Sequence, residues 1–380
     1  MSKVTTRLRD RDGFIIFIFC LAIFISIVDR AVISMNVPSI QEDLKLNEAA
    51  MGMVLSIFFV GYVLMQIPSG MLVDRLGAKK MILLALISWS IFTSLTGLAW
   101  SLVSILIIRL LFGIAEGGLP PASAKSVAEY FELSKRPRIT GIYRSVDIIG
   151  IALAPLVASP LILWLGWRNM FITIGIIGLI VAVFIWYFLK NPPQEQTDQK
   201  EQVNKIPLRE LAKISVVWKL GLAWFGTCIV AWGYTSWVPT YLMKVRHLKL
   251  MEATYVIAFG SLLAVGVTIL GGWLVGKYFK RNGLYILAIS NLLGAASLYL
   301  MFSSTSLALA LTGQIMTAIF LQLGNGGLWA LLHKIIPAKA IGSAAGMINF
   351  IGQIGGILAP STMGFLITAM NAFIMELSPS

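Results

Sequence analysis

Four charged side chains lie inside stretches of sequence that are otherwise almost entirely apolar. Asp29 and Arg30 fall in the first such stretch, and Arg109 and Glu116 fall in the fourth. An ionisable side chain at the centre of a bilayer costs at least about 2.5 kcal/mol, so it usually has a partner and faces inward. Carboxyl groups can carry protons, and the planar guanidinium of arginine binds carboxylates through two hydrogen bonds. The four residues therefore predict a site that handles protons and a small anion.

The surrounding stretches are typical of membrane-spanning helices. The chain has 380 residues, of which 58% are hydrophobic and 12% are charged, whereas a soluble domain averages about 25% charged residues. Eleven stretches approach the roughly 20 apolar residues needed to cross a bilayer, and backbone groups in lipid must bond within a helix. The sequence thus predicts an all-α polytopic membrane protein with spans near 14–37, 50–73, 81–99, 102–128, 140–165, 170–189, 217–243, 254–275, 284–302, 307–332 and 342–369.

The net charge of +13 follows the expected topology. Most lysine and arginine side chains outside the spans fall on one side, which the positive-inside rule assigns to the cytoplasm together with the amino terminus. We therefore expect a multi-pass protein of a bacterial inner membrane and no nucleic-acid partner. No nucleophile–base group or metal-ligand spacing is apparent, so the sequence predicts neither an enzyme nor a cofactor or metal site.

The chain divides into three parts. Residues 1–190 are expected to form an amino-terminal bundle of six helices, residues 191–216 a polar cytoplasmic linker, and residues 217–380 a bundle of helices seven to eleven. The same short pattern follows the second span of each half: Gly70-Met-Leu-Val-Asp74-Arg75 in the first and Gly272-Trp-Leu-Val-Gly276-Lys277 in the second. This internal repeat predicts two parallel bundles with a binding site at their interface.

The loop between the second and third spans resembles the signature loop of the major facilitator superfamily. Its residues are Gly70, Asp74, Arg75, Gly77, Lys79 and Lys80, and the resemblance implies a gating motif on the cytoplasmic side. Finer similarity, to the anion:cation symporter family of sugar-acid permeases and sialin-like carriers, rests on several motifs. They include Asp29-Arg30, Ser56-x-Phe58-Phe59-x-x-Tyr62, Arg109-x-x-x-Gly113-x-x-Glu116 and Trp329-Ala330-Leu331.

The family resemblance also implies roles for individual residues. Asp29 and Glu116 would carry protons, while Arg30 and Arg109 would manage the substrate carboxylate and the two acids. Three further residues match positions that line the substrate cavity of sugar-acid members: Tyr62, Trp329 and Asn349. The implied function is secondary active transport, with proton-coupled symport of a small organic anion by alternating access, in a protein that is expected to be a monomer.

Helix geometry predicts which of the charged residues meet. Asp29 and Arg109 lie at matched distances from one end of their helices, so an Asp29–Arg109 pair is available. Arg30 is turned about 100° from Asp29, so one of the two can meet a partner while the other faces the pathway. Glu116 is two turns from Arg109 on nearly the same face, close to the midplane. The alternative is a static network of charges that only holds the first and fourth helices together.

Two features depart from the family pattern. Asp147 stands where related permeases often present an amide, and Arg144 lies one turn before it. The two could form a structural ion pair, or Asp147 could be an altered substrate contact that favours an amine-bearing compound.

The second departure is at the carboxyl end, where residues 370–380 are too few to span a bilayer, so eleven spans are predicted and the twelfth helix is missing.

Two other functions remain open on the sequence. One is export of a drug-like or siderophore-like metabolite, which the paired acids and arginines disfavour. The other is a truncated homologue that does not transport, which only the lost helix suggests.

Overall fold

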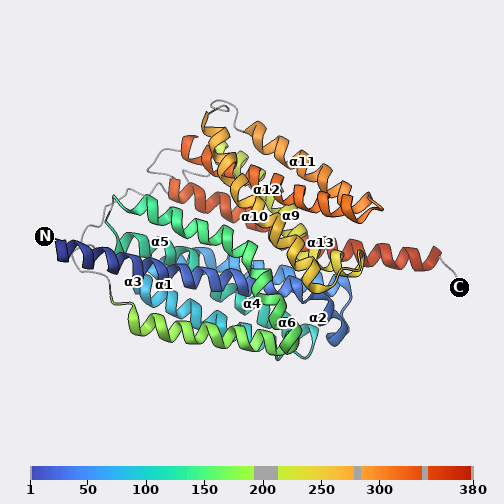
Figure 1. The fold of residues 1–380 in the computed structure, drawn as a ribbon, viewed down its shortest axis with the longest axis horizontal. Helices are drawn as coiled ribbons and strands as arrows, with labels where there is room; N and C mark the ends of the chain where they lie inside the picture. The colour runs from blue at the N-terminus through green and yellow to red at the C-terminus, as the bar shows by residue number, and fades with distance from the viewer. Residues whose placement is uncertain (1, 133, 192–212, 278–283, 336–340, 378–380) are drawn as a thin grey trace. The chain divides into compact units, whose positions relative to one another are not determined.

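The computed structural model describes residues 2–132, 134–191, 213–277, 284–335 and 341–377, and the secondary structure of this part is helical (Figure 1). Contacts divide the chain into two units. The first comprises Met1–Leu46 and Ile57–Glu201, and the second comprises Asn47–Ser56 and Gln202–Ser380.

The helices follow the expected order along the chain. In the first half they are α1 (Ser2–Met35), α2 (Val37–Leu44), α3 (Glu48–Thr96), α4 (Leu102–Glu116), α5 (Leu119–Tyr130) and α6 (Arg136–Phe188). In the second half they are α9 (Ser215–Lys244), α10 (Leu250–Lys277), α11 (Leu284–Ser303), α12 (Leu307–Ile335) and α13 (Ile341–Leu377). Within the first unit α1 packs along α6, and within the second α9 packs against α13 while α12 contacts both α10 and α11.

Two of the long helices contain a sharp turn at a glycine. Gly77 in α3 has φ 77° and ψ 166°, and Gly166 in α6 has φ 71° and ψ 165°. Glycine adopts such positive φ values without the clash that a Cβ atom would cause. Each glycine therefore separates two helices that each continue in their own direction.

Nine helices in the described part of the chain are long and apolar enough to cross a membrane. One of them, Arg138–Phe188, is 51 residues long and contains the turn at Gly166, so it has the length of two crossings. A shorter apolar helix, Ala288–Ser303, is found in addition. The expected total of eleven spans and the absence of a twelfth stay predictions.

The expected fourth span is not one continuous helix. It consists of α4 and α5, which are separated at Gly117 and Gly118. The reason lies in the next residues, because Pro120 and Pro121 have no N–H to donate to the carbonyls of Glu116 and Gly117. The Gly117 carbonyl instead accepts a hydrogen bond from the Ser69 hydroxyl at 3.1 Å. The helix therefore breaks directly after Glu116.

Glycines bring α3 and α4 into close contact beside that break. A Cβ atom on Gly113 would lie 2.1 Å from the carbonyl oxygen of Phe58, and one on Gly61 would lie 2.2 Å from that of Leu110. Small residues at such contacts let two helix backbones approach closely in a membrane. This packing fixes the Phe58 face of α3 against the face of α4 that carries the charged residues.

The second unit uses the same device between α9 and α13. A Cβ atom on Gly352 would lie 2.0 Å from the Trp224 ring. The start of α3 also belongs to this unit: the Ser56 hydroxyl accepts a hydrogen bond from the Ser361 backbone N–H at 3.0 Å.

Candidate functional site

An ion pair between Arg30 of α1 and Glu116 of α4 forms the centre of the charged group. The Arg30 Nη2 atom lies 2.8 Å from Oε1 of Glu116, whose side chain is fully buried, while that of Arg30 is 25% exposed. The Ser26 hydroxyl donates to the same Oε1 atom. The other oxygen of Glu116, Oε2, is buried and has no hydrogen-bond partner among the described residues.

Asp29 and Arg109 are buried beside this pair. Neither carboxylate oxygen of Asp29, nor Nε of Arg109, has a hydrogen-bond partner among the described residues. The possible Asp29–Arg109 ion pair does not form as a direct contact, because both carboxylate oxygens of Asp29 lack a hydrogen-bond partner among the described residues. The direct ion pair is Arg30–Glu116. Matched depth did not determine the partner: Arg30 is turned about 100° from Asp29 around α1 and shares the face of Ser26, one turn earlier.

The two arginines share one aromatic neighbour. The guanidinium carbons of Arg30 and Arg109 are each 5.3 Å from the centroid of Phe58. Arg30 also lies 5.1 Å from the Tyr62 ring, and Arg109 lies 4.6 Å from the Phe112 ring. Cations are attracted to the negative face of an aromatic ring, most strongly where water is excluded. Aromatic rings therefore help to hold both arginines in place.

Asp147 and Arg144 form the i,i+3 ion pair that their spacing on α6 allows. The Arg144 Nη1 atom lies 3.4 Å from Oδ2 of Asp147, and the two side chains are 75% and 40% exposed, with Arg144 the more exposed. Asp147 also interacts electrostatically with Arg30, so it lies near the central pair. The structure thus places the pair at the edge of the charged group.

The residues of the predicted gating motif surround the turn at Gly77. Asp74 accepts a hydrogen bond from Lys125 of α5 at 3.1 Å. Glu129 of α5 accepts the backbone N–H of Ala78 at 3.0 Å and lies beside Gly77. The rest of the motif is placed as follows: Gly70 half-buried on α3, Arg75 and Lys80 exposed, Lys79 half-buried.

One more ion pair outside the spans joins α1 to the start of α6. Lys135 donates to Asp12 at 2.7 Å. This hydrogen bond to the carboxylate raises the pKa of Lys135 above its usual value.

The remaining predicted cavity residues belong to the second unit. Asn349 is half-buried on α13. Trp329 is part of α12, and its side chain lies outside the described residues. The residues that the structure brings together are therefore those of the first unit: Asp29, Arg30, Tyr62, Arg109, Glu116 and Asp147.

Ser26, Phe58 and Glu129 belong to the site or its surroundings, although the sequence did not single out a role for them. Ser26 lies four residues before Arg30, so the i,i+4 spacing on one helix face was an available signal. Glu129 lies four residues after Lys125 and was a further acid beside the same span. Phe58 belonged to a motif of the family resemblance, but its contact with the two arginines had no signal, because an apolar aromatic residue in a membrane helix is ordinary packing material.

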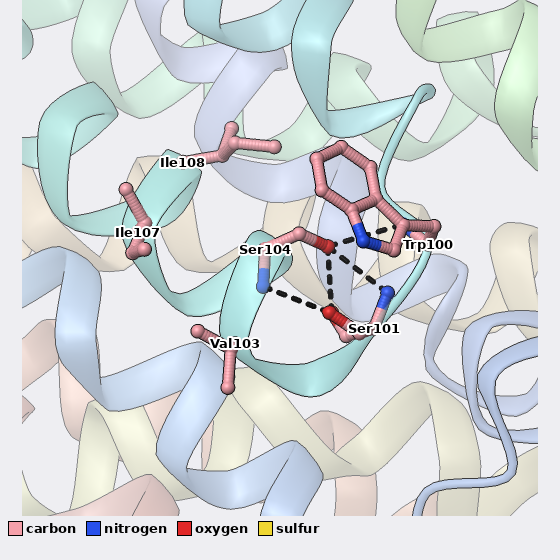
Figure 2. Close-up of a pocket in the computed structure, with 6 residues that line it drawn as sticks. All are labelled: Trp100, Ser101, Val103, Ser104, Ile107 and Ile108. Atoms are coloured by element: carbon pink, nitrogen blue, oxygen red, sulfur yellow. Dashed lines mark hydrogen bonds between the residues drawn. The ribbon is translucent and has the colours of Figure 1, made fainter.

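A pocket of about 270 Å³ lies at the start of α4, and none of the residues that line it belongs to the charged group (Figure 2). It is lined by Trp100, Ser101, Val103, Ser104, Ile107 and Ile108. Figure 2 shows that its polar atoms bond to each other: Ser101 Oγ accepts from the Ser104 N–H at 3.2 Å, and Ser104 Oγ accepts from the Ser101 N–H at 3.0 Å. This capping box satisfies the helix start, so the pocket offers mainly an apolar wall.

The helical bundle and its buried charges are those of a polytopic membrane carrier. The chain belongs to the Major Facilitator Superfamily, whose model matches residues 19–360. It is a multi-pass membrane protein and a secondary transporter, and it is not an enzyme.

Relatives give a finer comparison. The chain is 29% identical to the hexuronate transporter of Bacillus subtilis (strain 168), over 96% of this chain and 90% of that protein. It is also 29% identical to a probable sulfoacetate transporter of Cupriavidus necator, over 97% of this chain and 90% of the relative. Among solved structures, a bacterial homologue of the human lysosomal transporter Spinster matches with a TM-score of 0.85 at 24% identity, over 96% of this chain and 84% of that one, and this similarity concerns the fold.

Proposed function

We propose that the protein couples the inward movement of protons to the uptake of a small organic anion, a sugar acid or another carboxylate, by alternating access. The observation that carries this proposal is the pairing of Arg30. Its guanidinium is held by a fully buried carboxylate, Glu116, in a bundle where two further charged groups, Asp29 and Arg109, have buried atoms without hydrogen-bond partners among the described residues.

The coupling follows from competition for Arg30. While Glu116 is ionised, it occupies Arg30 and no net positive charge is available for an anion. A proton on Glu116 removes this competing charge, so Arg30 can bind a substrate carboxylate through its two parallel donors. Release of the proton on the other side would restore the ion pair and expel the anion. Asp29 would be the second proton carrier, and Arg109 would stabilise both acids.

The remaining predicted residues complete this proposal. Tyr62 beside Arg30, together with Trp329 and Asn349 of the second half, would contact the body of the substrate. The motif around Gly77 would close the pathway on the cytoplasmic side, with the amino terminus also cytoplasmic and the protein in a bacterial inner membrane. The relatives that are named as hexuronate and sulfoacetate transporters support an anionic substrate.

Uptake into proteoliposomes tests the proposal. Purified protein is reconstituted, an inward proton gradient is imposed, and accumulation of labelled sugar acids and other carboxylates is measured. We expect accumulation above equilibrium that a protonophore abolishes. The Glu116→Gln variant should lose accumulation, because a neutral amide cannot release a proton, but it should keep exchange of internal for external substrate.

Other outcomes separate the remaining functions. Efflux of a cationic or neutral drug against its gradient would favour the exporter. A well-folded protein that neither binds nor moves any of these compounds would favour a homologue that does not transport. Normal accumulation by Glu116→Gln would show that the proton assignment is wrong.

A further inference from the structure

Arg144 lies on an exposed stripe of α6 together with Gly141 and Ser145. The Arg144 side chain is 75% exposed although it belongs to a helix that crosses the membrane. A charged side chain in such a helix faces water or a partner and not lipid. The nearest exposed residues are small: a Cβ atom on Gly141 would have nothing within 4 Å, and Ser145, one turn further along, is exposed. By this argument the stripe faces water and not lipid.

Arg144 keeps most of its hydrogen-bonding capacity. A guanidinium has five N–H donors. Among the described residues, the contact of Arg144 is the one from Nη1 to Asp147 at 3.4 Å, which is longer than the roughly 2.7–2.9 Å of a strong charge-assisted bond. No other hydrogen bond of Arg144 is found among the described residues, so its remaining donors can bind an anion.

Asp147 is better suited to hold Arg144 than to bind a substrate amine. Its carboxylate pairs with the Arg144 guanidinium at 3.4 Å and lies within electrostatic range of a second one, that of Arg30. A substrate ammonium would be a third cation around one carboxylate. An acid group on the substrate would instead meet a guanidinium that has free donors and is already oriented by Asp147.

The charges of the first unit agree with a substrate that carries two negative charges. The group contains three acids and three arginines, which are Asp29, Glu116, Asp147, Arg30, Arg109 and Arg144. It is neutral when all are ionised. When the two proposed proton carriers are both protonated, an excess of two positive charges remains, and a dianion balances it.

We propose that Arg144, positioned by Asp147, binds a second acidic group of the substrate, so that the transported anion carries a carboxylate or sulfonate at each end. This inference rests on the proposed function, because it takes Arg30 as the contact for the first acid group. Arg144 is then the residue that distinguishes dianions from monoanions of the same length.

Matched pairs of compounds test this proposal. D-glucarate and D-gluconate differ at one end, where a carboxylate replaces a hydroxymethyl group, and sulfoacetate and acetate differ by a sulfonate. We expect kcat/KM for at least one dianion to exceed that of its monoanion by about tenfold or more, the effect of one hydrogen bond to a charged group. Arg144→Gln should remove about that factor for the dianion and change monoanion uptake by less than about twofold. Arg144→Lys should retain part of the preference, because it keeps the charge and loses the planar fork.

The control is Arg138→Gln, the same substitution at an exposed arginine nearer the start of α6, which should leave both members of each pair unchanged. Equal losses for dianion and monoanion in Arg144→Gln would overturn the proposal. The proposal would also be overturned if the wild-type protein preferred a 6-amino analogue of gluconate and the Asp147→Asn variant lost that preference.

Binding measurements separate this inference from the proposed function. The readout is thermal stabilisation of purified protein by each compound. Dianion binding that depends on Arg144, without gradient-driven uptake, would contradict coupled transport and retain the second contact. If only monoanions are taken up under the gradient, the proposal of coupled transport stands and the proposed contact of Arg144 with a second acid group is contradicted. No binding of any compound would contradict both.

Discussion

Arg30 and Glu116 join α1 to α4 across 86 residues of sequence through a contact of 2.8 Å. Both partners lie in apolar helices, and the acid has no access to solvent. The pair is therefore sensitive to the loss of either member, because the remaining charge would be buried without compensation.

Removal of the arginine tests this sensitivity. We expect Arg30→Gln to lower the free energy of unfolding by about 3 kcal/mol, since it leaves an ionised Glu116 buried. The double variant Arg30→Gln/Glu116→Gln should recover most of this loss, because no unpaired charge remains. Melting temperatures of the purified variants in detergent provide the measurement. Equal melting temperatures for the single and double variants would contradict the buried ion pair.

The hydrogen bond from Ser26 to Glu116 is expected to contribute to transport as well as to the stability of the fold. Ser26→Ala removes the hydroxyl that donates to Glu116 Oε1, and a loss of about 1 kcal/mol is expected. Gradient-driven uptake should fall several-fold, while Ser26→Thr, which keeps a hydroxyl, should retain most of it. Ser34→Ala is the control, because Ser34 is a buried serine on the same helix outside this contact. If both alanine variants transport equally well, Ser26 has no role in coupling.

Phe58 is expected to position the two guanidinium groups. Phe58→Leu keeps an apolar side chain but removes two cation–π contacts, each worth about 1 kcal/mol. Substrate affinity and uptake should both decrease, and Phe58→Tyr should restore them. Phe19→Leu provides the comparison, since Phe19 is a buried aromatic residue of α1 that stacks near Tyr130 and Tyr143. It should lose stability while its uptake per folded molecule remains normal.

Close packing of α3 on α4 gives a prediction about the backbone. Gly113→Ala would place a methyl group 2.1 Å from the Phe58 carbonyl oxygen, so the two helices must separate, at a cost of about 2 kcal/mol. Gly226→Ala on α9 is the matched control, because nothing lies within 4 Å of its added methyl group. The melting temperature of that variant should be unchanged or slightly raised, because alanine has a higher helix propensity than glycine. Similar melting temperatures for the two variants would argue against the close contact.

The parts of the site that depend on local chemistry could be predicted from the sequence. Charges buried in apolar segments indicate the site, because a charged side chain in a membrane is costly and is rarely placed there without a function. The Arg144–Asp147 pair was also predictable, since i,i+3 spacing on one helix defines the neighbours. A glycine followed by basic residues similarly indicated the turn at Gly77.

The partners within the charged group could not be predicted. Distances along two helices give the depths of Asp29 and Arg109, but not the rotation of each helix about its own axis. A rotation of about 100° per residue is enough to exchange Asp29 for Arg30 as the residue that faces α4. The break after Glu116 escaped prediction for another reason: the apolar composition continues through Gly117 and Gly118, and only the missing proline donors mark the end of the helix.

The two prolines after Glu116 have a mechanical consequence. The carbonyls of Glu116 and Gly117 have no helical N–H partner, so a change of angle between α4 and α5 at this point disrupts fewer backbone hydrogen bonds than it would in a continuous helix. Lys125 and Glu129 attach α5 to the turn of α3 at Gly77. When that turn moves, α5 can therefore change its angle at the break after Glu116. The part of α4 that carries Arg109 and Glu116 keeps its position.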